Sequence, residues 1–382
     1  MIAQGTEVLV GGAEHSLAFL AVLGGRVQLG KSPEVLPVSN YRPAKYEKAS
    51  ESRSSNFGDS VTIRRVNRNM HRGNQTTISE FILLGLSDQV EKQKLLFALF
   101  LAMYLVTVAG NGLIILAIGF DTHLHTPMYL FLANLSLADM SSSSTSIPKM
   151  LANIQTKSQS ISYSGCITQM YFSIVCTVAN NFLLGVMAYD RFVAVCHPLN
   201  YTTIMRPALC TLLTVIPWVL SNAVALTHTL LLIQVVFCDS NTLPHFFCDL
   251  APLLKLSCSD AAVSELVLLS VGLAVVTFPF AVILFSYICI IRDVLRISTL
   301  GGKWKAFSTC GSHLTVVLLF YGTIVGVYFF PSSTHPEDTD KIGAVLFTVV
   351  TPMLNPFIYS LRNKDVKGAL RKLIHKRQDS SF

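Results

Sequence analysis

Long apolar runs, separated by short polar segments, follow one another between about residues 95 and 361. Each run can cross a hydrocarbon core of about 30 Å, because that thickness takes about 20 helical residues. The seven runs are 95–119, 128–152, 166–195, 208–233, 262–291, 304–331 and 341–361. The second is the least apolar, since serines dilute it and Pro148 should kink its helix. The pattern predicts an all-α membrane protein, a bundle of seven transmembrane helices.

The composition excludes an ordinary soluble protein. Hydrophobic residues make up 51% of the 382 residues and charged residues 13%, whereas about a quarter of a typical soluble domain is charged. We therefore expect the lipid bilayer as a partner and no nucleic acid.

The distribution of Lys and Arg predicts the orientation. Basic residues gather after the third, fifth and seventh runs, as at Arg206, Lys303 and Lys364. The alternate loops are acidic, with Asp249 and Glu337 among their charges. Basic loops remain in the cytoplasm, so we expect an extracellular N-terminus and a cytoplasmic C-terminus.

The third run ends in an acid–base pair, Asp190-Arg191. Two charges at the mouth of a membrane helix are costly unless they are paired or functional. Such a pair can hold a helix bundle closed, and its release offers a guanidinium to the backbone carbonyls of a partner. For an isolated dipeptide, the simpler interpretation is an interfacial salt bridge that caps the helix.

Few polar residues lie inside the runs, and each is informative for that reason. Asn111, Asp139 and Asn355 fall at similar depth in the first, second and seventh runs. A carboxylate in the membrane needs partners, and the two amides are the obvious candidates. The three residues predict a polar cluster that joins three helices.

Four of the nine cysteines fall near the outer end of the third run or in the loop after the fourth run: Cys166, Cys238, Cys248 and Cys258. In an oxidising compartment they predict two disulfides, with three possible pairings. Their spacing does not match a zinc site, so we expect no metal there. The other five cysteines lie in or beside helices, where we expect them to be inert packing residues.

Four regions follow from these patterns. Residues 1–69 are expected to be a disordered or non-native extension, because residues 45–60 are rich in Ser, Glu and Lys and the apolar patch at 17–25 is too short to span a membrane. Residues 70–94 form an extracellular N-terminus, 95–361 the seven-helix domain, and 362–382 a cytoplasmic helix and tail. In this tail, apolar residues recur at helical spacing among basic ones, which predicts a short amphipathic helix on the inner leaflet. The apolar residues are Val366, Ala369, Leu370, Leu373 and Ile374.

Three Asn-x-Ser/Thr sequons are sorted by this topology. Asn74 lies outside and is the expected glycan acceptor. Asn134 lies within the bilayer and Asn200 in a cytoplasmic loop, so neither should be modified.

A series of motifs occurs in order at the helix ends. The most specific is the string 187–201, MAYDRFVAVCHPLNY. The others are Gly110-Asn111, residues 124–129, residues 135–139, Ser286-Tyr287, residues 305–314 and residues 352–363. Together they resemble vertebrate odorant (olfactory) receptors, within the rhodopsin-like (class A) G-protein-coupled receptors. The resemblance covers about residues 74–377, with Phe192 where that family usually has tyrosine.

The resemblance implies a G-protein coupling and activation switch. Its residues would be Asp190, Arg191, Tyr287, Tyr321, Asn355, Pro356 and Tyr359. Tyr287 and Tyr359 would swing toward Arg191 once the sixth helix moves outward. Pro356 would let the seventh helix bend. Tyr321 would be a rotamer switch below the ligand pocket, and a packed core tyrosine is the alternative.

The resemblance also implies a Na⁺ site at Asp139, beside Asn111. Many odorant receptors supply a second acid from the third helix, where this chain has Asn180, so we do not expect tight sodium binding. We expect no other cofactor. Of the possible disulfide pairings, the resemblance implies Cys166 with Cys248 and Cys238 with Cys258.

A ligand pocket is implied in the outer half of the bundle. Its residues would be Ser173, Ile174, Thr177, Val178, Leu268, Val271, Gly272, Ile324, Val325, Tyr328 and Thr348. This lining is apolar with a few hydroxyls and no charge, which suits a small, weakly polar volatile molecule. Any of these positions could instead be ordinary helix packing.

The sequence thus predicts an odorant receptor of the plasma membrane that activates a stimulatory, olfactory-type G protein and raises cyclic AMP. The alternative within the class is a chemoreceptor of the same fold outside olfactory tissue. A transporter would want internal repeats and ionisable groups at the midplane, and the runs contain essentially only Asp139. No residue cluster has catalytic spacing, so we expect no enzyme.

Overall fold

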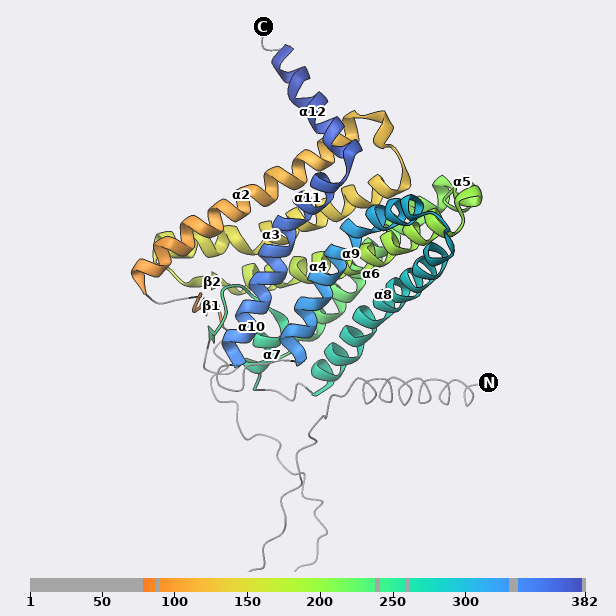
Figure 1. Cartoon of the computed structure of the whole chain (residues 1–382). Helices are drawn as coiled ribbons and strands as arrows, with labels where there is room; N and C mark the ends of the chain where they lie inside the picture. Colours follow the sequence, from red (N-terminus) through yellow and green to blue (C-terminus); the bar gives the residue numbers. More distant parts are fainter. Residues whose placement is uncertain (1–77, 87–88, 238–240, 259–261, 330–335, 380–382) are drawn as a thin grey trace, which may run out of the picture. The chain divides into compact units, whose positions relative to one another are not determined.

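The structure is a computed structural model that describes residues 78–86, 89–237, 241–258, 262–329 and 336–379. The extension 1–69, Asn74 and Cys238 lie outside these residues. The seven predicted runs correspond to long helices (Figure 1). These are α2 (Val90–Phe120), α3 (Pro127–Thr156), α4 (Tyr163–Cys196), α6 (Pro207–Leu232), α8 (Ala262–Arg296), α9 (Leu300–Phe329) and a last segment. That segment joins α10 (Pro336–Val345), the π-helix η3 (Leu346–Val350) and α11 (Thr351–Arg362).

Five helical segments among the described residues are long and apolar enough to cross a membrane: 91–120, 163–196, 207–232, 263–296 and 340–360. α3 is not one of them, as its serines lead one to expect. In α9 the apolar stretch is Cys310–Gly326. The fold is therefore that of an all-α membrane protein.

Local sequence explains where several helices begin. Pro127 and Pro207 stand at the first positions of α3 and α6, where the missing N–H of proline removes no helical hydrogen bond. The Ser162 side chain accepts a hydrogen bond from the Gly165 N–H and caps α4.

Two glycines allow close helix contacts. A Cβ on Gly110 of α2 would lie 2.9 Å from the Pro356 Cβ of α11. A Cβ on Gly185 of α4 would lie 3.2 Å from the Pro279 Cβ of α8. Each glycine therefore lets a proline of a neighbouring helix pack against its backbone.

A small sheet covers one end of the bundle, and the sequence patterns did not predict it. Its strands are β1 (Glu80–Leu83), β2 (Ser160–Ser162) and β3 (Thr242–Leu243), in the order β2-β1-β3. β1 pairs antiparallel with β2 and parallel with β3. Such short strands show no usable periodicity in the sequence.

The sheet lies at the same end as the short helix α7 (Leu250–Lys255) (Figure 1). We call this the sheet end, and the sheet together with residues 241–258 the lid. The helices α5 (Tyr201–Ile204) and α12 (Lys364–Asp379) lie at the opposite end, the α12 end.

The lid is fixed to α4. The predicted disulfide between Cys166 and Cys248 is formed. The Cys248 N–H donates to Gln169 Oε1 at 2.9 Å, and Gln169 Nε2 donates to the Thr145 carbonyl of α3. His245 is buried against two phenylalanines, and this burial lowers its pKa to about 4, so the ring is neutral at pH 7.

Of the second predicted disulfide, Cys238–Cys258, the structure describes one residue: Cys258 is disulfide-bonded, and Cys238 lies outside the described residues. The backbone on either side of it comes together nevertheless. Phe237 and Ser257 form a β-bridge, and the Cys258 N–H donates to the Val236 carbonyl.

The predicted amphipathic helix is α12. Its apolar face packs against the helix bundle, which the sequence did not predict. Val366 and Ala369 are buried in the same hydrophobic cluster as residues of the bundle. Lys372 forms an ion pair with Asp121 at 2.8 Å, at the end of α2, and this hydrogen-bonded partner lowers the pKa of Asp121. The first turns of α12 thus pack on the protein. The side chains of Leu373 and Ile374 lie outside the described ones.

Candidate functional site

α4 carries most of the predicted functional residues along its length. It packs against α3, α6 and α8 and contacts α9. Ser173 and Thr177 lie in its half nearer the sheet end, and Asp190 and Arg191 lie near the α12 end. Four α4 residues take part in the hydrogen bonds described below: Asn180, Asn181, Leu184 and Asp190.

Asp190 and Arg191 do not pair with each other. Asp190 is buried, and its Oδ1 accepts a hydrogen bond from the Tyr201 hydroxyl at 2.7 Å. Burial and the neighbouring Asp190 carboxylate raise the pKa of Tyr201, so the phenol keeps its proton. The Arg191 guanidinium contacts the Met128 sulfur. The expected acid–base pair is therefore replaced, because a hydroxyl from α5 satisfies the carboxylate.

Arg191 consequently has no carboxylate partner in the part of the chain that the structure describes. It remains partly exposed at the α12 end. A guanidinium is always charged and carries five N–H donors. The arrangement leaves this cation available to an incoming group.

Tyr287 of α8 and His313 of α9 form a buried pair. The Tyr287 hydroxyl lies 2.8 Å from His313 Nδ1, and the two rings stack. His313 Nε2 lies 3.1 Å from the Leu184 carbonyl of α4. A carbonyl can only accept, so Nε2 carries the proton and Nδ1 accepts from Tyr287. One imidazole therefore joins three helices.

Three further predicted switch residues, Asn355, Pro356 and Tyr359, lie on α11. The Tyr359 hydroxyl is buried and has no hydrogen-bond partner among the described residues. Pro356 packs against Gly110 of α2. An unpartnered buried hydroxyl costs about 1–3 kcal/mol, so Tyr359 gains by any movement that supplies a partner.

Two of the three asparagines predicted around Asp139 bind its carboxylate. Asn355 Nδ2 donates to Asp139 Oδ2 at 2.7 Å, as predicted. The second partner is Asn180, whose Nδ2 donates to Oδ1 at 3.1 Å. Asn111 does not bind the carboxylate and donates to the Thr107 and Pro352 carbonyls. Asn111 still joins α2 to α11, because it donates to the Pro352 carbonyl. Asn180 adds α4 to the helices that the cluster joins.

This cluster would offer a sodium ion one carboxylate and three amide oxygens that are unpartnered in the described part of the chain. Both Asp139 oxygens are occupied by amide N–H donors, and Asn180 brings no second negative charge. The carbonyl oxygens of Asn111, Asn180 and Asn355 have no partner among the described residues. Amide oxygens are neutral ligands, so the cluster has a single formal charge for a cation.

Tyr321 forms a second link between helices. Its hydroxyl donates to Asn181 Oδ1 at 2.5 Å, and Asn181 Nδ2 donates to the Val275 carbonyl of α8 at 2.6 Å. The Tyr321 ring also packs against Phe280 of α8. Tyr321 therefore connects α9 to both α4 and α8.

The predicted pocket residues differ in how deeply they are buried. Ser173, Val178 and Thr348 are buried. Ile174 and Leu268 pack in one hydrophobic cluster with the disulfide cysteines. Ile174 and Leu268 therefore belong to the cluster around the disulfide that attaches the lid to α4.

The remaining predicted pocket residues are less buried. Thr177, Val271 and Gly272 are half-buried, and a Cβ on Gly272 would meet no atom within 4 Å. Ile324 packs against the large core cluster. The Tyr328 side chain lies outside the described ones.

Val325 was wrongly placed in the pocket. Its side chain is 45% exposed, and it shares a helix face with Leu314 and Leu318, which are also exposed. Helical spacing puts all three on the outer surface of α9.

Sequence reasoning missed three residues that the structure brings into these groups: Tyr201, Asn181 and His313. A signal existed for the last two, because each is a polar residue inside an apolar run. Tyr201 begins the short helix α5 and ends the motif 187–201, but that motif gave it no role of its own.

Comparisons with known proteins agree with this geometry. The family model described as "Olfactory receptor" matches residues 100–377. Human "Olfactory receptor 1S1" is 77% identical over 315 residues, which are 82% of this chain and 97% of that protein. The chain belongs to the olfactory receptor family.

Other members of the olfactory receptor family match over similar lengths. Human "Olfactory receptor 1S2" is 75% identical over 82% of this chain and 97% of its own length. Mouse "Olfactory receptor 1M1" is 56% identical over 82% of this chain and 100% of its own length. Olfactory receptors are G-protein-coupled receptors and not enzymes, and this one is a multi-pass membrane protein that responds to odorants.

Proposed function

We propose that this olfactory receptor binds a small, weakly polar volatile molecule in the bundle and activates a stimulatory, olfactory-type G protein, raising cyclic AMP. Arg191 carries the proposal. Because Tyr201 satisfies Asp190, the guanidinium needs no internal carboxylate and can receive backbone carbonyls of the G protein.

The sheet end would face outward and the α12 end the cytoplasm, with the receptor in the plasma membrane. The basic residues near the α12 end support this orientation. Asn74 would then carry the glycan. Asn134 would not, since its side chain bonds to the Leu130 carbonyl and to Trp218 within the bundle.

Activation would act on the two links that α9 makes with α4. Moving the α12 end of α9 outward would break the contact of His313 with Leu184 and release Tyr287. Tyr287 and the unpartnered Tyr359 hydroxyl could then turn toward Arg191. Tyr321 lies between this region and the pocket, where ligand contact could alter its bond to Asn181.

The ligand class follows from the pocket chemistry. Ser173, Thr177, Tyr328 and Thr348 would supply hydroxyls, and the other predicted positions are apolar. A charged ligand would lose its hydration there without gaining an opposite charge. A neutral alcohol, ketone or ester would keep one or two hydrogen bonds.

A substitution at Gly272 tests the pocket. Gly272→Val should fill free space in α8, so the concentration of an active odorant needed for half-maximal cyclic AMP should rise at least tenfold. Gly326→Val is the matched control, because it also meets open space but lies on an exposed part of α9. An equal response of the two variants to a panel of neutral odorants would contradict the pocket assignment.

A further inference from the structure

A cavity at the sheet end lies apart from the predicted bundle pocket. It has a volume of about 250 Å³ and is bordered by the lid, the first turns of α2 and the end of α3. None of its lining residues in the described chain comes from α4, α8 or α9. The predicted bundle pocket draws almost all of its residues from those three helices.

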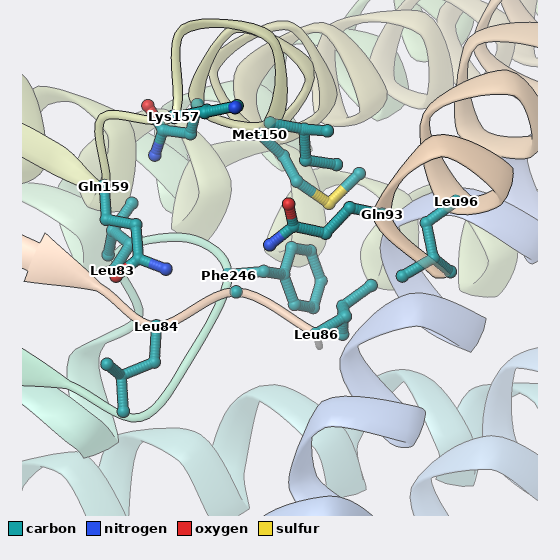
Figure 2. A pocket seen from close by; sticks show the side chains of 12 residues that line it. Leu83, Leu84, Leu86, Gln93, Leu96, Met150, Lys157, Gln159 and Phe246 are labelled. Carbon is teal, nitrogen blue, oxygen red and sulfur yellow. The ribbon is translucent and has the colours of Figure 1, made fainter. Parts of the chain in front are cut away.

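One side of the cavity is mostly apolar, although the Gln93 amide also lies there, beside Met150 and Phe246 (Figure 2). Leu86, Leu96, Met150 and Phe246 line it. Phe246 and Met150 belong to one buried cluster, which Leu86 and Leu96 extend. Such a wall can accept an alkyl chain but not a charged group.

The other side of the cavity is polar and carries a cation. Figure 2 shows Lys157 and Gln159 opposite Leu86 and Leu96, with Phe246 between them. Asn153 also lines this side, and no Asp or Glu does so among the described residues. Lys157 forms no ion pair in the described part of the chain.

The backbone of Lys157 is unusual for a lysine. Its φ of 55° is left-handed, and it is the sole non-glycine residue with positive φ among those described. Glycine or asparagine normally takes this position after a helix, because a Cβ there is strained. A glycine at position 157 would relieve this strain, yet the chain has a lysine there. The lysine side chain is therefore a candidate for a functional role.

The helix dipole of α2 adds to the positive potential. The cavity includes Gln93, in the first turn of α2, whose N-terminal end is positive. The negative C-terminal end of α3 is offset by the charge of Lys157 itself. An anionic head with a short alkyl tail therefore matches both sides of the cavity.

We propose that this cavity is a second binding site, for a small aliphatic carboxylate. The head would bind Lys157 and the amide of Gln159, and the tail would lie against Leu96, Met150 and Phe246. The volume is just below the range for drug-sized ligands, which limits the tail to medium length. The site goes beyond the proposed odorant function and does not depend on it.

An occupant would add to the contacts that Phe246 and Phe247 of the lid already make with α2 and α3. It would contact Phe246, two residues before the disulfide-bonded Cys248, and Leu84 of the segment that bonds to Leu243. It would thereby hold the lid against α2 and α3. Bound carboxylate should shift the odorant response at least threefold, because the lid lies over Ile174 and Leu268.

Direct binding to the purified full-length receptor tests the site without G-protein signalling. Sodium octanoate is the probe, and octanol and octylamine carry the same tail with other heads. We expect saturable binding of octanoate, and at least tenfold weaker binding of the other two. Octanol binding as tightly as octanoate, or no saturable octanoate binding, would overturn the proposal.

Variants separate binding from folding. Lys157→Gly removes the charge and relieves the backbone strain, so the receptor should keep its thermal stability but bind octanoate at least tenfold more weakly. Lys157→Arg should retain binding, and Lys255→Gln, which removes an exposed lysine of α7 outside the cavity, should change nothing. Unchanged octanoate binding by Lys157→Gly would overturn the proposal.

The bundle pocket is distinguished by Gly272→Val. This variant should lose odorant sensitivity and keep octanoate binding. If it lost octanoate binding instead, the carboxylate would be in the bundle pocket and the second site would be wrong. If it kept its odorant response while Lys157→Gly lost octanoate, the pocket assignment would fail and the second site would stand.

Discussion

Single polar side chains connect the helices of this receptor. His313 joins α4, α8 and α9 through one imidazole, and Asn181 joins the same three helices through Tyr321 and the Val275 carbonyl. Each bond lies in an apolar interior, where a lost partner leaves a group that water cannot reach. These residues therefore contribute to stability as well as to switching.

Replacing Tyr321 with Phe should destabilise the receptor. The change removes the 2.5 Å bond and leaves Asn181 Oδ1 buried without its donor, which typically costs about 1–3 kcal/mol. The thermal unfolding midpoint of the purified protein measures the effect. Tyr104→Phe is the control, because its bond to Ser144 is exposed. Equal midpoints for the two variants would contradict the role given to the buried bond.

Residue identities could be predicted from the sequence better than their partners. Asp139 and Asn355 were expected to meet and do so. The sequence placed both Asn111 and Asn180 near Asp139 but could not show that only Asn180 binds the carboxylate, because that depends on how each helix is rotated. It also could not show that Tyr201 binds Asp190, since the loop path decides this contact.

At the scale of elements, the long apolar runs determine the helices and single small residues determine how closely they pack. The seven runs predicted the helices because membrane-spanning length is a strong signal. The three-stranded sheet could not be predicted, since its strands have only two to four residues. The buried face of α12 was also missed, because amphipathicity alone does not distinguish lipid from protein.

Gly110→Ala tests the contact between α2 and α11. The new Cβ would lie 2.9 Å from Pro356, so the helices must separate. Overpacking of this kind typically costs about 1–3 kcal/mol. Surface delivery, measured by antibody labelling of intact cells, should fall. Gly112→Ala, in the same helix with no atom within 4 Å, should be tolerated, and equal delivery of both would sink the argument.

The disulfide of the lid should be essential for maturation. Cys166→Ser or Cys248→Ser removes a cross-link between residues 82 apart in sequence, and loss of such a bond typically costs about 2–5 kcal/mol. We expect little receptor at the cell surface. Cys176→Ser is the matched control, since Cys176 is a free buried thiol. Equal losses in all three variants would argue against a specific role of the bond.

For the whole molecule, binding and coupling should need only the part of the chain that the family shares. Human "Olfactory receptor 1S1" aligns over 97% of its length with 82% of this chain. Residues 1–69 contain no run of spanning length, no cysteine and no sequon. They should therefore be dispensable.

A chain that starts at Met70 tests this expectation. It should reach the surface and respond to an active odorant with unchanged sensitivity, because Asn74, the lid and all helices remain. Surface labelling and cyclic AMP are measured beside the full chain. Loss of trafficking that is restored only by residues 1–69 would reveal a targeting function.

The most direct measurement of the central claim is odorant-dependent cyclic AMP for Arg191→Ala, in cells that supply an olfactory-type stimulatory G protein. The variant should reach the surface, since Arg191 has no carboxylate partner among the described residues, yet give no cyclic AMP response. Arg206→Ala, an exposed arginine at the same end of the bundle, should respond like the wild type. A full response from Arg191→Ala at normal surface density would contradict the account.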